Sequence, residues 1–170
     1  AVDSGDIVIA GENFSDSWKP ENAQKNMEQI LTANDNNIDA VLSQNDGMAG
    51  GVVAALSAQG LVIPVGGQDG DLAAINRVAR GSQTVSVWKN ATNLGTAAGE
   101  IASALAAGTA MADIEGASMF TGGEKGTAVP SILLDPTPLT IANLSVAIDA
   151  GHISKEQACE GAMDGVDGCM

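Results

Sequence analysis

The chain of 170 residues contains few aromatic, basic and histidine side chains. It has no tyrosine, two tryptophans, two phenylalanines and a single histidine, His152. That histidine is far in sequence from any Ser or Cys nucleophile pattern, so we expect it at the surface and see no support for histidine acid–base chemistry. Seven Lys and Arg residues oppose 21 Asp and Glu residues, a formal net charge of −14. This charge repels phosphate backbones and anionic lipids, so we expect no nucleic-acid partner.

Long apolar runs and metal motifs are also missing. No stretch approaches the roughly 20 apolar residues of a membrane helix, and the first residues lack the pattern of a signal peptide. We therefore expect either a cytoplasmic chain or one whose signal was removed or never included. The segment Asp35–Asp39 imitates the start of a calcium loop but continues with Ala40 where the turn glycine belongs, so neither metal nor cofactor is predicted.

The two cysteines, Cys159 and Cys169, have no nearby histidine to complete a metal set. They can form a local disulfide in an extracytoplasmic protein or remain two free thiols, and the disulfide is favoured.

With 45% hydrophobic residues, the chain can bury one good core, and strand and helix patterns alternate along it. The expected strands are Asp6–Gly11, Ile38–Gln44, Leu61–Gly66 and Gln83–Lys89, and the expected helices are Pro20–Asn34, Met48–Gly60, Leu72–Gly81 and Asn93–Gly108. Strands separated by such helices predict an α/β fold, a doubly wound parallel sheet with helices on both faces.

The pattern loosens after Gly108, where we expect a surface excursion with a short irregular strand. Val129–Leu144 reads as a last extended segment, interrupted by Pro136 and Pro138 and therefore an edge strand. One or two short helices are expected from Ser145 onward.

In a parallel sheet, ligands bind beyond the carboxyl ends of the strands. The residues expected there are polar, with planar rings among them: Glu12, Asn13, Phe14, Asp16, Trp18, Asn45, Asp46, Gln68, Asp69, Asp71, Trp88, Lys89 and Asn90. Three of the four aromatic residues fall in this set rather than in the predicted core. Amide, carboxylate and ammonium groups suit vicinal hydroxyls, and an indole stacks on a sugar ring, so the set predicts a carbohydrate or polyol site.

Structural roles compete with ligand binding for several of these residues. Asp46 and Asp71 each precede an apolar helical run, and a helix-capping role is favoured for them over ligand contact. Asn45 can be a turn former, Asp69 a surface turn residue and Trp18 a core residue.

Four linked motifs carry a resemblance to a known family: W-x-P-E-N, S-x-N-D-x-x-A-G-G, G-Q-D and T-V-x-W-K. Together, over Gly11 to Leu144, they resemble the C-terminal lobe of the D-xylose-binding, periplasmic-type substrate-binding proteins of ABC sugar importers. The resemblance implies one lobe of a type I periplasmic-binding-protein fold, incomplete in this chain, and a ligand cleft between two lobes.

The resemblance also implies site residues. Trp18 is similar to the ring that lines the sugar site, and Asn45, Asp69 and Lys89 resemble side chains that hydrogen-bond sugar hydroxyls. Phe14 and Trp88 are further candidates, although relatives often carry tryptophan and tyrosine there, and the loop before G-Q-D is short. These departures leave the identity of the pentose open.

The family's proteins are about twice as long, with an N-terminal lobe and a first βα unit that this chain lacks. The resemblance therefore implies C-terminal-lobe βα units over residues 1–89, a segment crossing to the N-terminal lobe over 90–128, and a final strand and tail over 129–170. The missing lobe is expected in cis or as a separate chain.

The expected function is binding of a monosaccharide, D-xylose first, without chemistry, for delivery to the membrane subunits of an ABC permease. The expected place is the periplasm or the extracellular face, with a lipid anchor open for the full-length protein, and there Cys159 and Cys169 should form a disulfide. Two other classes stay open: an effector-binding domain of a sugar-responsive regulator or chemoreceptor, and a carbohydrate-active enzyme using Asp69 and Asp71.

Overall fold

The computed structural model describes residues 1–170 and divides into two compact units. The first comprises Ala1–Trp88 together with Pro138–Met170, and the second comprises Lys89–Thr137. No helix in either unit combines the length and the apolarity that crossing a bilayer requires.

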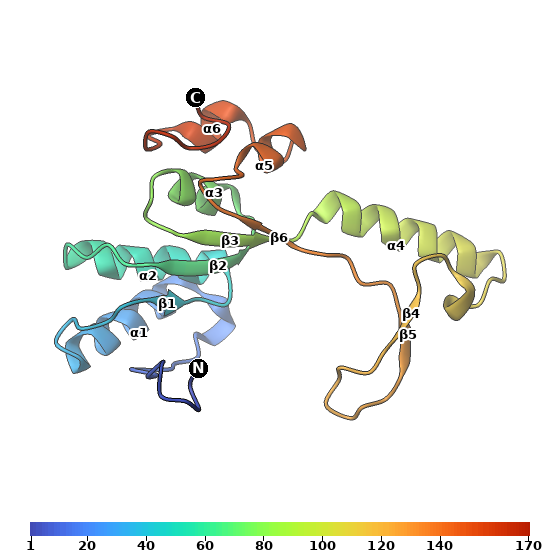
Figure 1. Cartoon of the computed structure of the whole chain (residues 1–170), viewed down its shortest axis with the longest axis horizontal. Helices are drawn as coiled ribbons and strands as arrows, with labels where there is room; N and C mark the ends of the chain where they lie inside the picture. Colours follow the sequence, from blue (N-terminus) through green and yellow to red (C-terminus); the bar gives the residue numbers. More distant parts are fainter. The chain divides into compact units, whose positions relative to one another are not determined.

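The first unit is built on a four-stranded sheet in the order β1-β2-β3-β6 (Figure 1). Its strands are β1 (Val41–Leu42), β2 (Val65–Asp69), β3 (Val85–Trp88) and β6 (Thr137–Leu139). The pairs β1–β2 and β2–β3 are parallel, and helices α2 (Asp46–Ala58) and α3 (Leu72–Ala79) connect them. The predicted parallel α/β sheet is confirmed, and β6 lies at its edge as expected.

Two apolar clusters form the core of this unit. One joins α1 (Pro20–Ala33) to α2 and β2 through Met27, Leu31, Ala49 and Val65. The periodicity of α1 explains its share, because Ala23, Met27 and Leu31 recur every fourth residue on one face. The two helices approach closely at Gly51, where a Cβ atom would overlap the backbone carbonyl of Pro20, so only glycine fits there.

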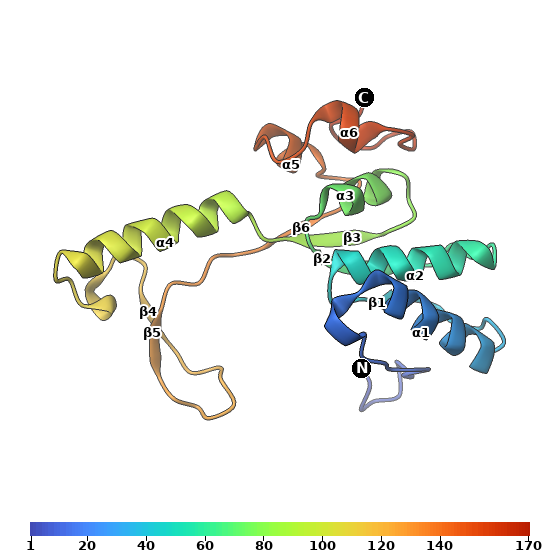
Figure 2. The same ribbon diagram turned by 180° about the vertical axis from the view of Figure 1, so that it is seen from behind.

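Helices α1 and α2 cover one face of this sheet (Figures 1 and 2). Ser86 and Trp88 alternate with more accessible neighbours along β3, and they contact α2 and α3 respectively. The opposite face carries Leu42, which is 88% exposed. Figures 1 and 2 show α1 and α2 on the same side of the strands.

The predicted first strand, Asp6–Gly11, is wrong. These residues form no strand, and Val8 at their centre is 82% exposed. A strand requires a neighbour, and β1, the strand at that end of the sheet, pairs only with β2. Apolar sequence alone therefore does not form a strand here.

The second core cluster joins α3 and β3 to the C-terminal tail. The tail contains α5 (Ser145–Asp149) and α6 (Lys155–Cys159), the two short helices expected there. Ile75 and Val78 of α3 pack with Leu144, Ile153 and other tail residues. Asn76 Nδ2 donates hydrogen bonds to the backbone carbonyls of Gln157, Ala158 and Glu160, at 3.2, 3.2 and 2.9 Å. The tail is therefore tied to α3 by both apolar and polar contacts.

The tail is closed by a disulfide between Cys159 and Cys169, with a Cα–Cα distance of 5.4 Å. We expect replacement of both cysteines by serine to lower the free energy of unfolding by about 2–4 kcal/mol, because the bond restricts the unfolded chain. Urea unfolding of the double variant and the wild type measures this difference. Two alkylatable thiols in the native protein, seen by mass spectrometry, would rule the bond out.

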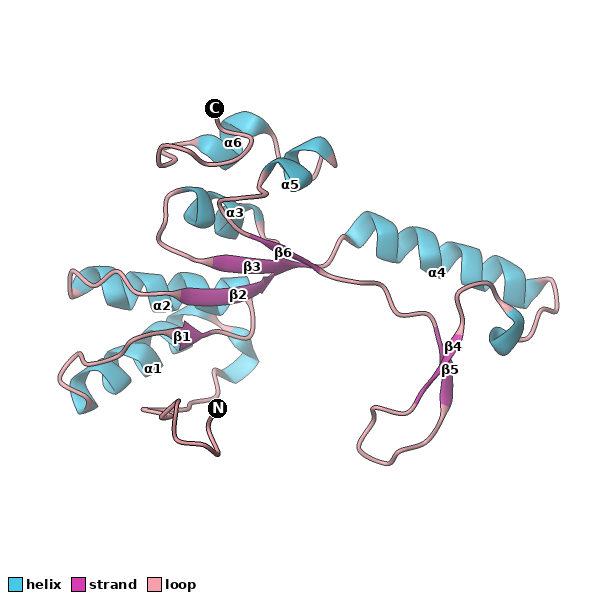
Figure 3. Ribbon diagram, in the orientation of Figure 1, coloured by secondary structure: helices cyan, strands magenta, loops and turns pink.

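The second unit contains α4 (Ala91–Ala106), a 3₁₀ turn η2 (Met111–Asp113) and an antiparallel pair of strands, β4 (Ser118–Phe120) and β5 (Val129–Ser131) (Figure 3). The extended segment predicted over Val129–Leu144 is thus divided between β5 and β6, and Pro136 lies between them. The chain re-enters the first unit at Pro138. Helix α4 has no buried residue.

Candidate functional site

Two predicted ligand residues lie at the ends of neighbouring strands of the first unit. Asn45 follows β1, and Asp69 is the last residue of β2. Because these strands are adjacent and parallel, both residues lie at the carboxyl edge of the sheet. Asn45 Oδ1 accepts a hydrogen bond from Met48 N at 2.9 Å and caps α2.

The predicted aromatic residues Phe14 and Trp18 precede α1 and face solvent. Phe14 is 94% exposed and Trp18 is 70% exposed, so Trp18 is not a core residue. Trp18 lies in the turn η1 (Asp16–Trp18), two residues before Pro20. A Cβ atom at Gly47 would lie 3.9 Å from Pro20 Cγ and 3.7 Å from Asn45 Oδ1. The segment that carries Trp18 therefore reaches α1 beside the Asn45 loop.

Beneath these loops lies a buried carboxylate, Asp46, with no exposed surface. Its Oδ2 accepts hydrogen bonds from Ser86 Oγ at 2.6 Å, Gly70 N at 2.9 Å and Asp71 N at 3.0 Å. Its Oδ1 accepts one from Gln83 Nε2 at 2.8 Å. We call these five residues the Asp46 network. It ties the start of α2 to β3 and to the loop after β2.

Arg77 of α3 supports the network from the side. Its guanidinium donates to the Asp46 backbone carbonyl at 2.7 Å and to Gln83 Oε1 at 3.0 Å. Burial lowers the pKa of Arg77, while the charges of Asp46 and Asp71 act in the opposite direction. The positive charge compensates a site that otherwise collects carboxylates.

The residues Asp69, Gly70 and Asp71, which we call the Gly70 turn, have an unusual backbone. Asp69 has φ +107° and Gly70 has φ +77°. A non-glycine residue with such a φ is strained and persists only where its surroundings hold it. Burial raises the pKa of the Asp71 carboxyl, and the charges of Asp46 and Asp69 raise it further. The turn therefore brings the carboxyl groups of Asp69 and Asp71 close to the buried Asp46.

The structure corrects three sequence-based interpretations. Asp46 does not cap α2, since Asn45 does, and Asp71 stands at the cap position of α3 without a side-chain cap bond. Trp88 was expected among the solvent-facing aromatics, but it is 3% exposed and packs in the second core cluster. The alternation of β3 turns its ring inward, so it cannot stack on a ligand. Lys89 follows directly after Trp88, as the first residue of the second unit.

His152, expected at the surface, is partly buried under the Gly70 turn. Its Nε2–H donates to the Gly70 carbonyl oxygen at 2.7 Å. Sequence reasoning missed this contact and the Asp46 network, since no local pattern links residues so far apart in the chain.

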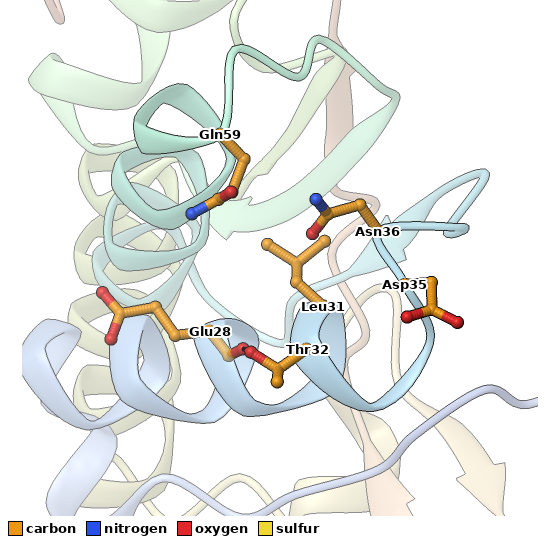
Figure 4. Close-up of a pocket in the computed structure, with 6 residues that line it drawn as sticks. All are labelled: Glu28, Leu31, Thr32, Asp35, Asn36 and Gln59. Carbon is orange, nitrogen blue, oxygen red and sulfur yellow. Dashed lines mark hydrogen bonds between the residues drawn. The ribbon is translucent and has the colours of Figure 1, made fainter.

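A surface hollow of about 460 Å³ lies elsewhere, between the C-terminal ends of α1 and α2 (Figure 4). Its lining residues are Glu28, Leu31, Thr32, Asp35, Asn36 and Gln59. No predicted ligand residue is among them. Helix C-termini lie at the amino ends of parallel strands, away from the edge where such sheets bind ligands, so we do not assign this hollow to the site.

Residues 2–110 match the family model described as periplasmic binding protein domain. The D-xylose-binding periplasmic protein of Escherichia coli (strain K12) is 44% identical over 157 residues, which cover 91% of this chain and 46% of that protein. The protein of the same name from Haemophilus influenzae is also 44% identical, with the same coverage. The chain spans about half the length of the curated relatives it matches.

Solved structures of solute-binding proteins superpose on this chain. An ABC transporter solute-binding protein from Clostridium phytofermentans, with bound β-D-glucose, superposes with a TM-score of 0.74 at 28% identity, over 92% of this chain and 51% of that one. A carbohydrate transporter solute-binding protein from Chloroflexus aurantiacus, in complex with D-glucose, gives a TM-score of 0.70 at 27% identity, over 82% of this chain and 42% of that one. By its sequence match and its parallel α/β sheet, the chain belongs to the periplasmic binding protein family.

Proposed function

We propose that this chain supplies about half of a monosaccharide-binding site, that the sugar is D-xylose, and that the complete protein delivers it to an ABC importer in the periplasm. The 44% identity to two D-xylose-binding periplasmic proteins, which extends over 91% of the chain, carries the proposal. The positions of Asn45 and Asp69 at one edge of the sheet support it.

The chemistry of the residues fits a polyol. The Asp69 carboxylate accepts hydrogen bonds from hydroxyl groups, and Asn45 Nδ2 and the Lys89 ammonium donate to hydroxyl oxygens. The exposed indole of Trp18 offers a flat apolar surface to the CH-rich face of a sugar ring. These groups recognise and orient a ligand, and we assign no bond-breaking step to them.

A second lobe completes the proposed site. The chain spans 46% of each D-xylose-binding relative, and we propose that the remaining half of the complete protein supplies the other contacts and closes over the sugar. Residues 90–128 are proposed to cross to that lobe. The importer's membrane subunits are the proposed protein partners.

The test is calorimetric titration of D-xylose into the full-length protein carrying Asp69→Asn or Lys89→Met. Each change removes a charge-assisted hydrogen bond to a hydroxyl in a water-poor site, and we expect a loss of about 1.5–3 kcal/mol in binding, roughly 10- to 150-fold in Kd. Thermal unfolding should show an intact fold.

Asp35→Asn is the matched control. It removes the same charge at another residue with positive φ, 51°, but at the end of α1 beside the surface hollow. Asparagine tolerates that backbone conformation. Its xylose affinity should equal that of the wild type. Unchanged affinity in both site variants would refute the site assignment, and a preference for D-glucose over D-xylose would refute the sugar.

A further inference from the structure

Both backbone groups of Gly70 are held by side chains from other parts of the chain. Its N–H donates to Asp46 Oδ2 at 2.9 Å and to Ser86 Oγ at 3.1 Å. Its carbonyl oxygen accepts from His152 Nε2 at 2.7 Å, across 82 residues of sequence. The Asp69–Gly70 peptide is therefore held through its N–H, and the Gly70–Asp71 peptide through its carbonyl oxygen and through the Asp71 N–H that donates to Asp46 Oδ2.

Packing adds to the polar contacts. The His152 ring lies against Trp88, with ring centroids 5.0 Å apart and an angle of 37° between the planes. Gly70 packs on the same indole, since a Cβ atom there would overlap Trp88 Cδ1. Gly70 and His152 therefore both pack against the buried indole of Trp88, which limits how far either can move relative to the other.

We propose that His152 is a positioning residue for sugar binding, which holds the Gly70 carbonyl and thereby fixes the adjacent Asp69 in its binding conformation. The inference rests on the function proposed above. It makes the C-terminal tail, which follows the last strand and carries no predicted ligand residue, a determinant of sugar affinity.

The physical reason is the strain of the turn. A residue with the backbone of Asp69, φ +107°, tends to relax unless its neighbours hold it. Without the bond from His152, the Gly70–Asp71 peptide is held only through the Asp71 N–H, so the turn loosens and Asp69 samples orientations that do not meet the ligand. Sugar binding must then order the turn again, which lowers affinity without removing a direct contact.

Asn76 provides a matched control, because it separates this role from simple packing of the tail. Its three hydrogen bonds tie the same tail to α3 but none reaches the Gly70 turn. Asn76→Ala should therefore weaken tail docking and leave the turn in place. His152→Gln tests the bond itself, since a glutamine Nε2 can donate to the same carbonyl.

The experiment measures amide hydrogen exchange of Gly70 and Asp71 without sugar, D-xylose affinity, and the melting temperature in the full-length protein. We expect His152→Ala to speed exchange at both amides and to weaken xylose binding about tenfold. His152→Gln should recover most of both. Asn76→Ala should lower the melting temperature while exchange at these amides and xylose affinity remain those of the wild type.

Each contrary outcome is distinct. Wild-type affinity in His152→Ala, or an equal loss in Asn76→Ala, would overturn the positioning role. Unchanged hydrogen exchange at the Gly70 amide in His152→Ala would also overturn the positioning role, even where the wild-type protein binds sugar. Failure of the wild type to bind any pentose or hexose would instead overturn the proposed function.

Discussion

Replacing Asp46 with alanine is expected to lower the free energy of unfolding by about 3–5 kcal/mol, because the carboxylate satisfies four donors in a site without solvent. The donors are Gly70 N, Asp71 N, Ser86 Oγ and Gln83 Nε2. With the carboxylate gone, the Asp71 amide loses its acceptor, and the Gly70 amide keeps only Ser86 Oγ. The nearby Arg77, whose guanidinium still donates to the residue-46 carbonyl, loses the compensating negative charge.

Asp46→Asn tests whether the network needs a carboxylate and not only a side chain of this shape. It keeps the shape, but whichever way the amide turns, its NH₂ group meets a donor: the amides of Gly70 and Asp71 at Oδ2, or Gln83 Nε2 at Oδ1. We expect it to be nearly as destabilising as alanine. Guanidinium unfolding followed by circular dichroism measures both, with the exposed Asp39→Ala as a control for loss of one negative charge. An Asp46 variant as stable as that control would contradict the network's role.

The helices could be predicted from the sequence because their signals are local. The repeat of Ala23, Met27 and Leu31 and proline at the first turn define α1 within a few residues. Strands depend on partners elsewhere. Ile7–Ile9 have as much β propensity as β3, yet they lie exposed without a neighbouring strand.

Side-chain direction was harder to predict than element type. In β3 the apolar Val85 and Val87 alternate with Ser86 and Trp88, and the usual rule would point the valines inward. The structure buries Ser86 and Trp88 instead, because Asp46 supplies an acceptor for the serine hydroxyl. Polar burial of this kind cannot be read from one strand alone.

The candidate site likewise depends on both local signals and contacts between distant parts of the chain. The positions of Asn45 and Asp69 follow from strand order, since residues after adjacent parallel strands share an edge. The groups that bond Gly70, the residue after Asp69, come from 24 residues earlier, at Asp46, and 82 residues later, at His152. Only the folded chain brings them together.

The 170-residue chain alone is expected to bind D-xylose too weakly for detection at micromolar concentration and to self-associate. In the function proposed above, a second lobe supplies about half of the contacts and closes over the sugar, so these 170 residues without it should lack most of the binding free energy. We expect the chain to self-associate because α4 carries an exposed apolar stripe. Leu94, Ala98, Ile101 and Leu105 follow helical spacing, yet none is buried, and Leu94 and Leu105 are each 47% exposed.

Covering this stripe gains about 25 cal/mol for each Å² of apolar surface removed from water, which favours any partner that packs on it. We expect light scattering to show oligomers at micromolar concentration and calorimetry to show no heat from xylose. Leu94→Gln with Leu105→Gln is the matched variant, since glutamine keeps helix propensity while removing apolar surface. The variant should shift the chain toward monomer and still bind no xylose. Adding an N-terminal lobe should both suppress the self-association and restore the affinity for xylose. A stable monomer of the 170-residue chain that binds xylose at micromolar concentration would instead show that this chain needs no second lobe.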